Sequence, residues 1–210
     1  MYKIKLKVCG MRDDDNIMAV AGAQPDYMGF IFYPQSPRFV GNDFEFLVQL
    51  PNSIKKVGVF VNASSEEMLR QAKRLSLDCL QLHGNESVNQ CEELKKSEAN
   101  LIKAFSIGED FDFDVIKPYQ PFVDYFLFDT KGKSYGGNAR TFDWTILEKY
   151  DQKIPFFLSG GISPYNAADI TRLGAMNVHA VDVNSGVEIQ PGLKDVVKIE
   201  AIKKLLNNEE

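Results

Sequence analysis

Residues 155–186, PFFLSGGISPYNAADITRLGAMNVHAVDVNSG, contain two apolar, strand-like runs separated by a helical pattern. The apolar runs cover residues 155–158 and 178–183, and the helical pattern covers residues 164–173. Two strands joined by a helix are typical of parallel pairing, because parallel strands need a long crossover connection. This stretch therefore predicts a unit of a parallel β-sheet with a helix packed on it.

The same alternation runs through the rest of the chain. Apolar runs predict six further strands, at residues 4–9, 27–32, 56–61, 79–82, 101–105 and 123–128. Further helical patterns lie at residues 13–22, 64–75, 87–96, 142–149 and 195–206, with a short helix or turn at 44–50. Eight strands with helical crossovers predict the α/β class and a single (β/α)8 TIM barrel over residues 1–210. A doubly wound open sheet is the alternative that the strand count leaves open.

Composition excludes several classes of protein. The 210 residues include 24 Lys and Arg against 29 Asp and Glu, a net charge of −5, which argues against a general nucleic-acid binder. The apolar runs are shorter than the ~18 residues of a membrane span, and MYKIKLKVCGM does not resemble a secretory signal. Three cysteines without a CxxC and two histidines argue against a disulfide scaffold and a metal site. We expect a cytoplasmic protein without membrane partners.

In a (β/α)8 barrel, chemistry is found at the carboxyl ends of the strands. Cys9 ends the first predicted strand, where a thiolate can act as a base or nucleophile, although cysteine is also a common packing residue. Asp129 ends the sixth, where a carboxylate can act as a general acid or cap a loop. These two strands are well separated along the barrel, so both side chains can face its mouth from opposite sides.

Glycine-containing loops follow the seventh and eighth predicted strands. Gly160 and Gly161 lie in the first loop, and Ser185 and Gly186 lie in the second. These two positions form the usual phosphate site of phosphate-binding barrels, where backbone N–H groups and a helix N-terminus approach the anion. Arg38 lies in YPQSPRFV, whose two prolines stiffen the loop; it can bind a carboxylate with both arms of its guanidinium or lie in solvent.

Two strand residues form a candidate buried ion pair. Lys7 and Cys9 share one face of the first predicted strand, because side chains alternate, so both face the interior if one does. A buried ammonium needs a partner, and Asp182 on the eighth strand is the candidate. His83 ends the fourth strand and can hydrogen-bond in the mouth or cap the next helix, whereas His179 lies inside a strand and is predicted to be structural.

Two other features have simpler interpretations. Cys79 and Cys91 are predicted to be packing residues. Residues 131–142, KGKSYGGNARTF, lack the spacing of a Walker motif and predict either an active-site lid or an ordinary surface loop.

Several short segments, in order along the chain, resemble the phosphoribosylanthranilate isomerase family of tryptophan biosynthesis. KVCGM, SPRFV, QLHG and DVNSGVE are the most specific of them in combination. The matching segments are KVCGM (7–11), GFIFYPQSPRFV (29–40), VGVFVN (57–62), LQLHGNE (80–86), IKAF (102–105), FDTKG (128–132), TFDW (141–144), LSGGISP (158–164) and VDVNSGVE followed by PGLKD (181–195).

This resemblance implies a (β/α)8 fold and an isomerase. The family converts N-(5-phosphoribosyl)anthranilate into 1-(2-carboxyphenylamino)-1-deoxyribulose 5-phosphate by an Amadori rearrangement. The resemblance implies no metal and no organic cofactor, and a small phosphorylated molecule as substrate. It allows a monomer or a homodimer, and we expect a monomer.

The resemblance also implies roles for individual residues. Cys9 corresponds to the general base, Asp129 to the general acid and Arg38 to the arginine that holds the anthranilate carboxylate. His83 and Asp182 are expected to contact the substrate. The loops at Gly160 and Gly161 and at Ser185 and Gly186 correspond to the phosphate region. Residues 136–139 read Gly-Gly-Asn-Ala where the family often has GG-x-G, which affects only the expected shape of the lid.

Two other functions remain open on these residues. One is another cofactor-free sugar-phosphate isomerase on the same barrel, which needs the phosphate loops but not Cys9, Arg38 and Asp129 together. The other is a non-catalytic barrel that binds a phosphorylated ligand. The presence of an acid, a base and an anchor in one chain favours the isomerase of the resembled family.

Overall fold

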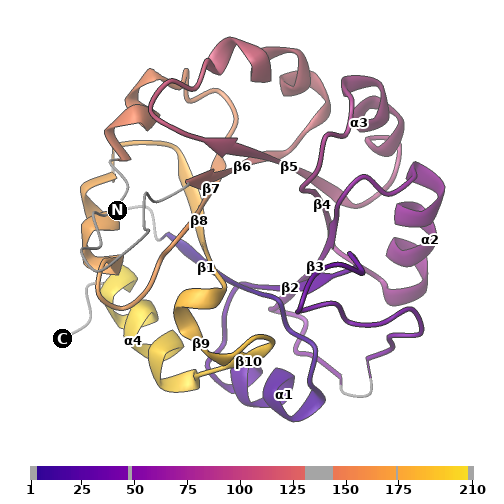
Figure 1. The fold of residues 1–210 in the computed structure, drawn as a ribbon, viewed down its shortest axis with the longest axis vertical. Helices are drawn as coiled ribbons and strands as arrows, with labels where there is room; N and C mark the ends of the chain where they lie inside the picture. The colour runs from indigo at the N-terminus through magenta and orange to yellow at the C-terminus, as the bar shows by residue number, and fades with distance from the viewer. Residues whose placement is uncertain (1–3, 47–48, 131–143, 174, 208–210) are drawn as a thin grey trace.

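The computed structural model describes residues 4–46, 49–130, 144–173 and 175–207. Figure 1 shows a central ring of strands with the helices outside it. The strands form a closed barrel in chain order, and β1 pairs with both β2 and β8 in parallel. The predicted (β/α)8 barrel is therefore confirmed, and the doubly wound open sheet is excluded.

The strands lie close to their predicted positions. The predictions for the fourth and eighth strands match at both ends, and the others differ by one or two residues at an end. The strands are β1 (Lys5–Cys9), β2 (Tyr27–Ile31), β3 (Lys55–Phe60), β4 (Cys79–Leu82), β5 (Asn100–Ile107), β6 (Tyr125–Thr130), β7 (Phe156–Ser159) and β8 (Val178–Val183).

The helical connections are of two kinds. The α-helices are α1 (Asp14–Gly22), α2 (Ser65–Leu75), α3 (Val88–Leu94) and α4 (Val196–Asn207). The 3₁₀ segments are η1 (Phe113–Phe122), η2 (Trp144–Lys149), η3 (Ala167–Leu173) and η4 (Ser185–Val187). The predicted capping pattern at Ser64–Glu67 is confirmed, because the Ser64 side chain accepts a hydrogen bond from the Glu67 N–H and so begins α2.

Several local predictions were wrong or incomplete. The described residues between 44 and 50 form neither a helix nor a turn. The helices predicted at 142–149 and 164–173 are the 3₁₀ segments η2 and η3, and η3 begins only at Ala167. A two-stranded hairpin of β9 (Glu188–Gln190) and β10 (Leu193–Lys194) follows β8, and no sequence pattern predicted strands this short.

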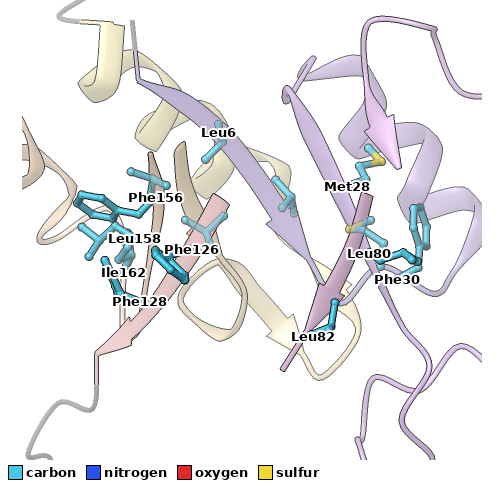
Figure 2. Close-up of a cluster of buried hydrophobic side chains, with 14 of the residues drawn as sticks. Leu6, Met28, Phe30, Leu80, Leu82, Phe126, Phe128, Phe156, Leu158 and Ile162 are labelled. Atoms are coloured by element: carbon cyan, nitrogen blue, oxygen red, sulfur yellow. The ribbon is translucent and has the colours of Figure 1, made fainter. Parts of the chain in front are cut away.

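The core has two layers because successive strand residues point to opposite faces. Phe126 and Phe128 belong to the layer between the barrel wall and the helices, which Figure 2 shows in close-up, together with residues such as Leu80 and Leu158. Leu127, between the two phenylalanines, belongs instead to the layer that fills the barrel. Each strand therefore supports both layers, and a shift of one residue would exchange them.

A bulge between β7 and β8 turns His179 toward the inner layer. Phe156 pairs with Val178 but Phe157 pairs with Ala180, so His179 is the extra residue on β8. The hydroxyl of Tyr27 lies 2.7 Å from the His179 Nε2, and the ring of Phe157 packs against the imidazole. These contacts agree with the structural role predicted for this histidine.

None of the helices in the described parts of the chain is both long enough and apolar enough to cross a bilayer.

His179 is expected to make the stability depend on pH. Burial, assisted by the nearby Lys5 cation, lowers the pKa of His179 from 6.5 to about 4. Between these values the unfolded chain binds a proton that the folded chain does not, so this contribution is complete above pH 6.5 and is lost as the pH falls through 4. Urea unfolding at pH 7 and pH 5 should show a smaller loss of unfolding free energy in His179→Gln than in the parent. Equal losses in the two proteins would contradict the assignment.

Candidate active site

The carboxyl ends of the strands surround a cavity of about 390 Å³, a size typical of small-molecule sites. All the predicted site residues except Arg38 line it. They are Cys9, His83, Asp129, Gly160, Gly161, Asp182, Ser185 and Gly186. The barrel thus brings together side chains and loops from five strands, at the end where the sequence placed them.

Cys9 and Asp129 enter this cavity from distant strands. Cys9 ends β1 and Asp129 lies near the end of β6, and β7 and β8 separate these strands on one side of the ring. The Cys9 side chain is buried, whereas that of Asp129 is about one-third exposed. A ligand in the cavity therefore has a thiol on one side and a carboxyl group on the other.

His83 contacts its neighbours in the mouth of the barrel. Its Nδ1 lies 2.8 Å from the Gln81 Nε2, and its Nε2 lies 3.9 Å from the Asp129 Oδ2. Of the two predicted roles, hydrogen bonding in the mouth is therefore observed, and capping is not, because Ser87 caps α3. The carboxyl group on the β6 side of the cavity thus has an imidazole beside it.

Arg38 is held by a carboxylate that the sequence analysis missed. Its Nε and Nη2 donate to the two oxygens of Glu188, at 2.8 and 2.5 Å. The Lys194 ammonium donates to the same carboxylate at 2.6 Å. Burial alone would raise the pKa of Glu188, but these hydrogen bonds outweigh it and lower the pKa to about 2. Glu188 therefore fixes the guanidinium of Arg38 from the hairpin that follows β8.

The loops after β7 and β8 lie against each other at the cavity. Gly160 and Gly161 have φ angles of 105° and 64°, in the region that favours glycine. A Cβ at Gly186 would lie 2.0 Å from the carbonyl oxygen of Ile162, so the two loops approach more closely than another residue would allow. The backbone is thus exposed to the cavity as the phosphate prediction requires, although no α-helix begins there as predicted.

The predicted pair of Lys7 and Asp182 is confirmed. The Lys7 Nζ donates to the Asp182 Oδ2 at 2.8 Å, and both side chains are buried. Burial raises the pKa of the Asp182 carboxyl, and the Lys7 ammonium opposes this. The other oxygen, Oδ1, has no hydrogen-bond partner in the described part of the chain. Asp182 therefore lies at the cavity with one oxygen bound and one unpaired.

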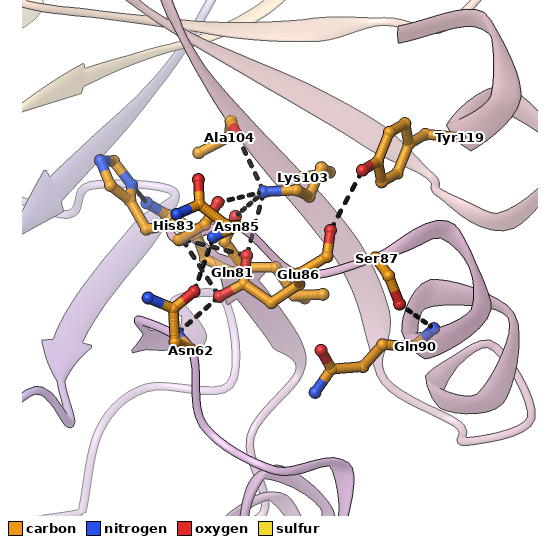
Figure 3. A network of polar contacts seen from close by, with 12 residues as sticks. Asn62, Gln81, His83, Asn85, Glu86, Ser87, Gln90, Lys103, Ala104 and Tyr119 are labelled. Atoms are coloured by element: carbon orange, nitrogen blue, oxygen red, sulfur yellow. Dashed lines mark hydrogen bonds and ion pairs between the residues drawn. The ribbon is translucent and has the colours of Figure 1, made fainter. Parts of the chain in front are cut away.

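A second buried ion pair, which the sequence analysis missed, supports the segment that carries His83 (Figure 3). The Lys103 Nζ donates to the Glu86 Oε2 at 3.0 Å, and both side chains are almost fully buried. The same ammonium donates to the carbonyl oxygens of Leu82 and Gly84, the residues on either side of His83. The motif LQLHGNE contained Glu86, but nothing in its spacing identified Lys103 as the partner.

The predicted lid, residues 131–142, and its departure from the family pattern at 136–139 lie outside the described residues.

A (β/α)8-barrel enzyme whose cavity opens at the carboxyl ends of its strands is the class that this fold and site define. The family model described as N-(5'phosphoribosyl)anthranilate (PRA) isomerase matches residues 6–205. The chain belongs to the N-(5'-phosphoribosyl)anthranilate isomerase family.

Individual relatives agree with this family. The N-(5'-phosphoribosyl)anthranilate isomerase of Parabacteroides distasonis is 48% identical over 202 residues, which cover 92% of this chain and 89% of that protein. The crystal structure of the phosphoribosyl anthranilate isomerase from Thermotoga maritima has a TM-score of 0.86 and 33% identity, covering 98% of this chain and 99% of that one. Another crystal structure contains the isomerase in complex with reduced 1-(o-carboxyphenylamino)-1-deoxyribulose 5-phosphate, with a TM-score of 0.84, 30% identity and coverage of 98% and 99%.

The burial of Glu86 and Lys103 leads to a specific prediction about the free energy of unfolding. Lys103→Met should lower the free energy of unfolding by about 3–5 kcal/mol, because it leaves the Glu86 carboxylate buried without its cation. The double variant Glu86→Gln with Lys103→Met, which buries no charge, should recover most of this loss. Urea denaturation of the parent and both variants measures it. A double variant no more stable than Lys103→Met would show that the loss comes from the packing and backbone hydrogen bonds of Lys103 and not from the unpaired charge of Glu86.

Proposed function

We propose that this chain catalyses the Amadori rearrangement of N-(5-phosphoribosyl)anthranilate to 1-(2-carboxyphenylamino)-1-deoxyribulose 5-phosphate, a step of tryptophan biosynthesis. The observation that carries the proposal is that Cys9 and Asp129 line one cavity from distant strands, in a chain of this isomerase family. The 210 residues act as one barrel domain, and the reaction needs proton transfers but no cofactor.

Asp129 is the general acid in this proposal. Opening of the ribose ring requires a proton on the ring oxygen, and the partly exposed Asp129 carboxyl is placed to deliver it. The open form is a protonated Schiff base, which makes the hydrogen on C2 acidic. The proximity of the His83 Nε2 supports a substrate-site role for this histidine, because it can donate a hydrogen bond to the carboxylate that remains.

Cys9 is the general base. As a thiolate it removes the C2 proton from the Schiff base, and the resulting enolamine tautomerises to the ketose. The reaction leaves a protonated Cys9 and an ionised Asp129, and the two groups are restored when the thiol loses a proton to solvent and the carboxylate gains one. A positioned acid or base typically contributes ~10²–10⁴-fold to the rate.

The two ends of the substrate are held by different parts of the mouth. The loops at Gly160, Gly161 and Gly186 support phosphate binding, because they bring backbone to the surface of the cavity. Arg38 holds the anthranilate carboxylate through Nη1, which donates to no residue in the described part of the chain. The unpaired Oδ1 of Asp182 supports its role as an acceptor for a sugar hydroxyl. Anchoring at both ends fixes the reacting carbon between acid and base.

Two oligomeric and cellular details are also proposed. We expect a monomer, because the exposed large apolar side chains lie on separate elements: Met18, Val115, Tyr165, Ile189 and Val197. The isomerase of Thermotoga maritima is described as dimeric, so the expectation needs its own measurement. Light scattering of the purified chain at micromolar concentration should give the mass of one chain, 23.7 kDa, and twice that mass would contradict it.

The three buried, unpaired cysteines support a location in the reducing cytoplasm.

The reaction is tested by turnover of freshly prepared phosphoribosylanthranilate, followed by the loss of anthranilate-type fluorescence. The parent should be active, and Cys9→Ser and Asp129→Asn should each lower kcat by ~10²–10⁴-fold, because each removes one positioned proton transfer. Cys91→Ala is the matched control, since Cys91 is a buried thiol in α3 outside the cavity and should leave kcat unchanged.

The result also separates the alternatives. A folded parent that binds inorganic phosphate but turns over nothing would favour a different sugar-phosphate isomerase or a non-catalytic binding barrel. An active parent whose Cys9→Ser and Asp129→Asn variants keep full activity would show that the acid and base lie elsewhere.

A further inference from the structure

We propose that Lys7 is a positioning residue for the catalytic base: its ammonium, held inside the barrel by Asp182, is the positive charge beside which the Cys9 thiolate forms. The inference rests on the proposed role of Cys9 as base. It gives a chemical purpose to a buried lysine that the substrate does not need to contact.

The register of the barrel places these groups together. Lys7 and Cys9 are two residues apart on β1, so both side chains point to the same face. Lys7 pairs in register with Asp182 on β8, and Cys9 pairs with Gly29 on β2. The Lys7 side chain has no exposed surface, and its Nζ lies 2.8 Å from the Asp182 Oδ2. The ammonium is therefore fixed at one level of the barrel, directly below the thiol.

The Cys9 sulfur is also confined on its other side. A Cβ built on Gly29 would lie 2.7 Å from the Cys9 Sγ, so the sulfur fills the space that a larger residue would occupy. The thiol is buried apart from the surface that it presents to the cavity. Its ionisation must then depend on the charges that the barrel provides.

Four charged groups from four parts of the chain face this sulfur. They are Lys7 on β1, Asp182 on β8, Lys194 on β10 and Arg38 in the segment after β2. Burial raises the pKa of the Cys9 thiol above its ordinary value, and the charge of Lys7 is the largest of the effects that oppose this rise. Asp182 raises the same pKa, while Lys194 lowers it less than Lys7 does. All three cations have a carboxylate partner, Asp182 for Lys7 and Glu188 for Arg38 and Lys194, and Lys7 acts most strongly on the thiol.

Stability alone is a poor explanation for the Lys7–Asp182 pair. Removing two charges from water carries a large desolvation penalty, and apolar residues of similar volume often stabilise a core as well or better. Asp182 holds Lys7 through one oxygen only, and the ammonium retains donors for the sulfur. The pair therefore brings a positive charge into an apolar interior at the point where the reaction needs a negative one.

The proton balance follows from this arrangement. The Cys9 thiol releases its proton to solvent through the cavity, and the thiolate forms next to Lys7, which stays protonated throughout. The thiolate then takes the C2 proton of the substrate and becomes a thiol again. Lys7 neither gives nor receives a proton. It contributes by increasing the fraction of Cys9 that is ionised at neutral pH.

The test measures the ionisation of Cys9 directly and does not need the substrate. The folded, ligand-free protein is alkylated with iodoacetamide, an uncharged probe, over a range of pH, and modification of Cys9 is quantified by peptide mass spectrometry. In Lys7→Met the pH midpoint of alkylation should rise by ~1–3 units, the usual effect of an opposite charge at this range, with at least a tenfold slower reaction at pH 7. Lys7→Arg, which keeps the charge, should restore much of the parent midpoint.

The control is the other buried lysine pair. Glu86→Gln with Lys103→Met removes an ion pair of similar burial, between β5 and the segment after β4, and should leave the Cys9 midpoint unchanged. Near-ultraviolet circular dichroism checks that each variant is folded. Lys7→Gln, which keeps a hydrogen-bond donor for Asp182, replaces Lys7→Met if the methionine variant does not fold. An unchanged midpoint in the folded Lys7 variant, or an equal shift in the control, overturns the proposal.

Turnover separates this inference from the proposed function. In Lys7→Met, kcat/KM should fall on the acidic side of its pH profile and recover at high pH, with little change in KM. Cys9→Ser could keep full activity while Lys7→Met still shifts the alkylation midpoint. The proposed base would then be wrong, and the proposal that Lys7 positions it would fail as well, although the charge of Lys7 would still affect the thiol. If Cys9→Ser is inactive and the midpoint does not move in Lys7→Met, Cys9 remains the base and the role of Lys7 fails alone.

Discussion

Strand β1 pairs with β8 in parallel, and this pairing turns an open sheet of eight strands into a closed barrel. Every functional feature of the cavity depends on it. In an open sheet the ends of β1 and β6 would lie several strand spacings apart, whereas closure brings Cys9 and Asp129 to one cavity. The same pairing sets Lys7 beside Asp182 in register, so the join that completes the fold also buries the charged pair beneath the thiol.

Three cations lie on the Cys9 side of the cavity with the two carboxylates that bind them. Lys7, Lys194 and Arg38 favour the negative charge that forms on Cys9 in the proposed reaction, whereas Asp182 opposes it. Asp129 lies on the other side with His83 as a polar neighbour. A protein with a net charge of −5 gains no general attraction for an anionic substrate, so these local positive charges must do that work.

The sequence was sufficient where alternation along a strand and the order of strands in a closed barrel determined the answer. Alternation on a single strand and the need of a buried ammonium for a partner predicted the pair of Lys7 and Asp182 correctly. The strand ends placed Cys9 and Asp129 at the cavity. Contacts between elements that no sequence pattern links were not predictable. One example is the hydrogen bond from Arg38 to Glu188, which depends on a hairpin of only a few residues. The bulge at His179 was also not predictable from the sequence, because it depends on how β7 and β8 pair.

Lys7 and Asp182 are 175 residues apart in the sequence, which has a consequence for the synthesis of the protein. A ribosome adding ~5–20 residues per second needs roughly 10 to 35 seconds to make that length of chain. Until Asp182 has been made, Lys7 lacks its carboxylate partner, and the incomplete sheet keeps an open edge that other chains could join. The barrel can therefore lose its last open edge only after the final strand has been made.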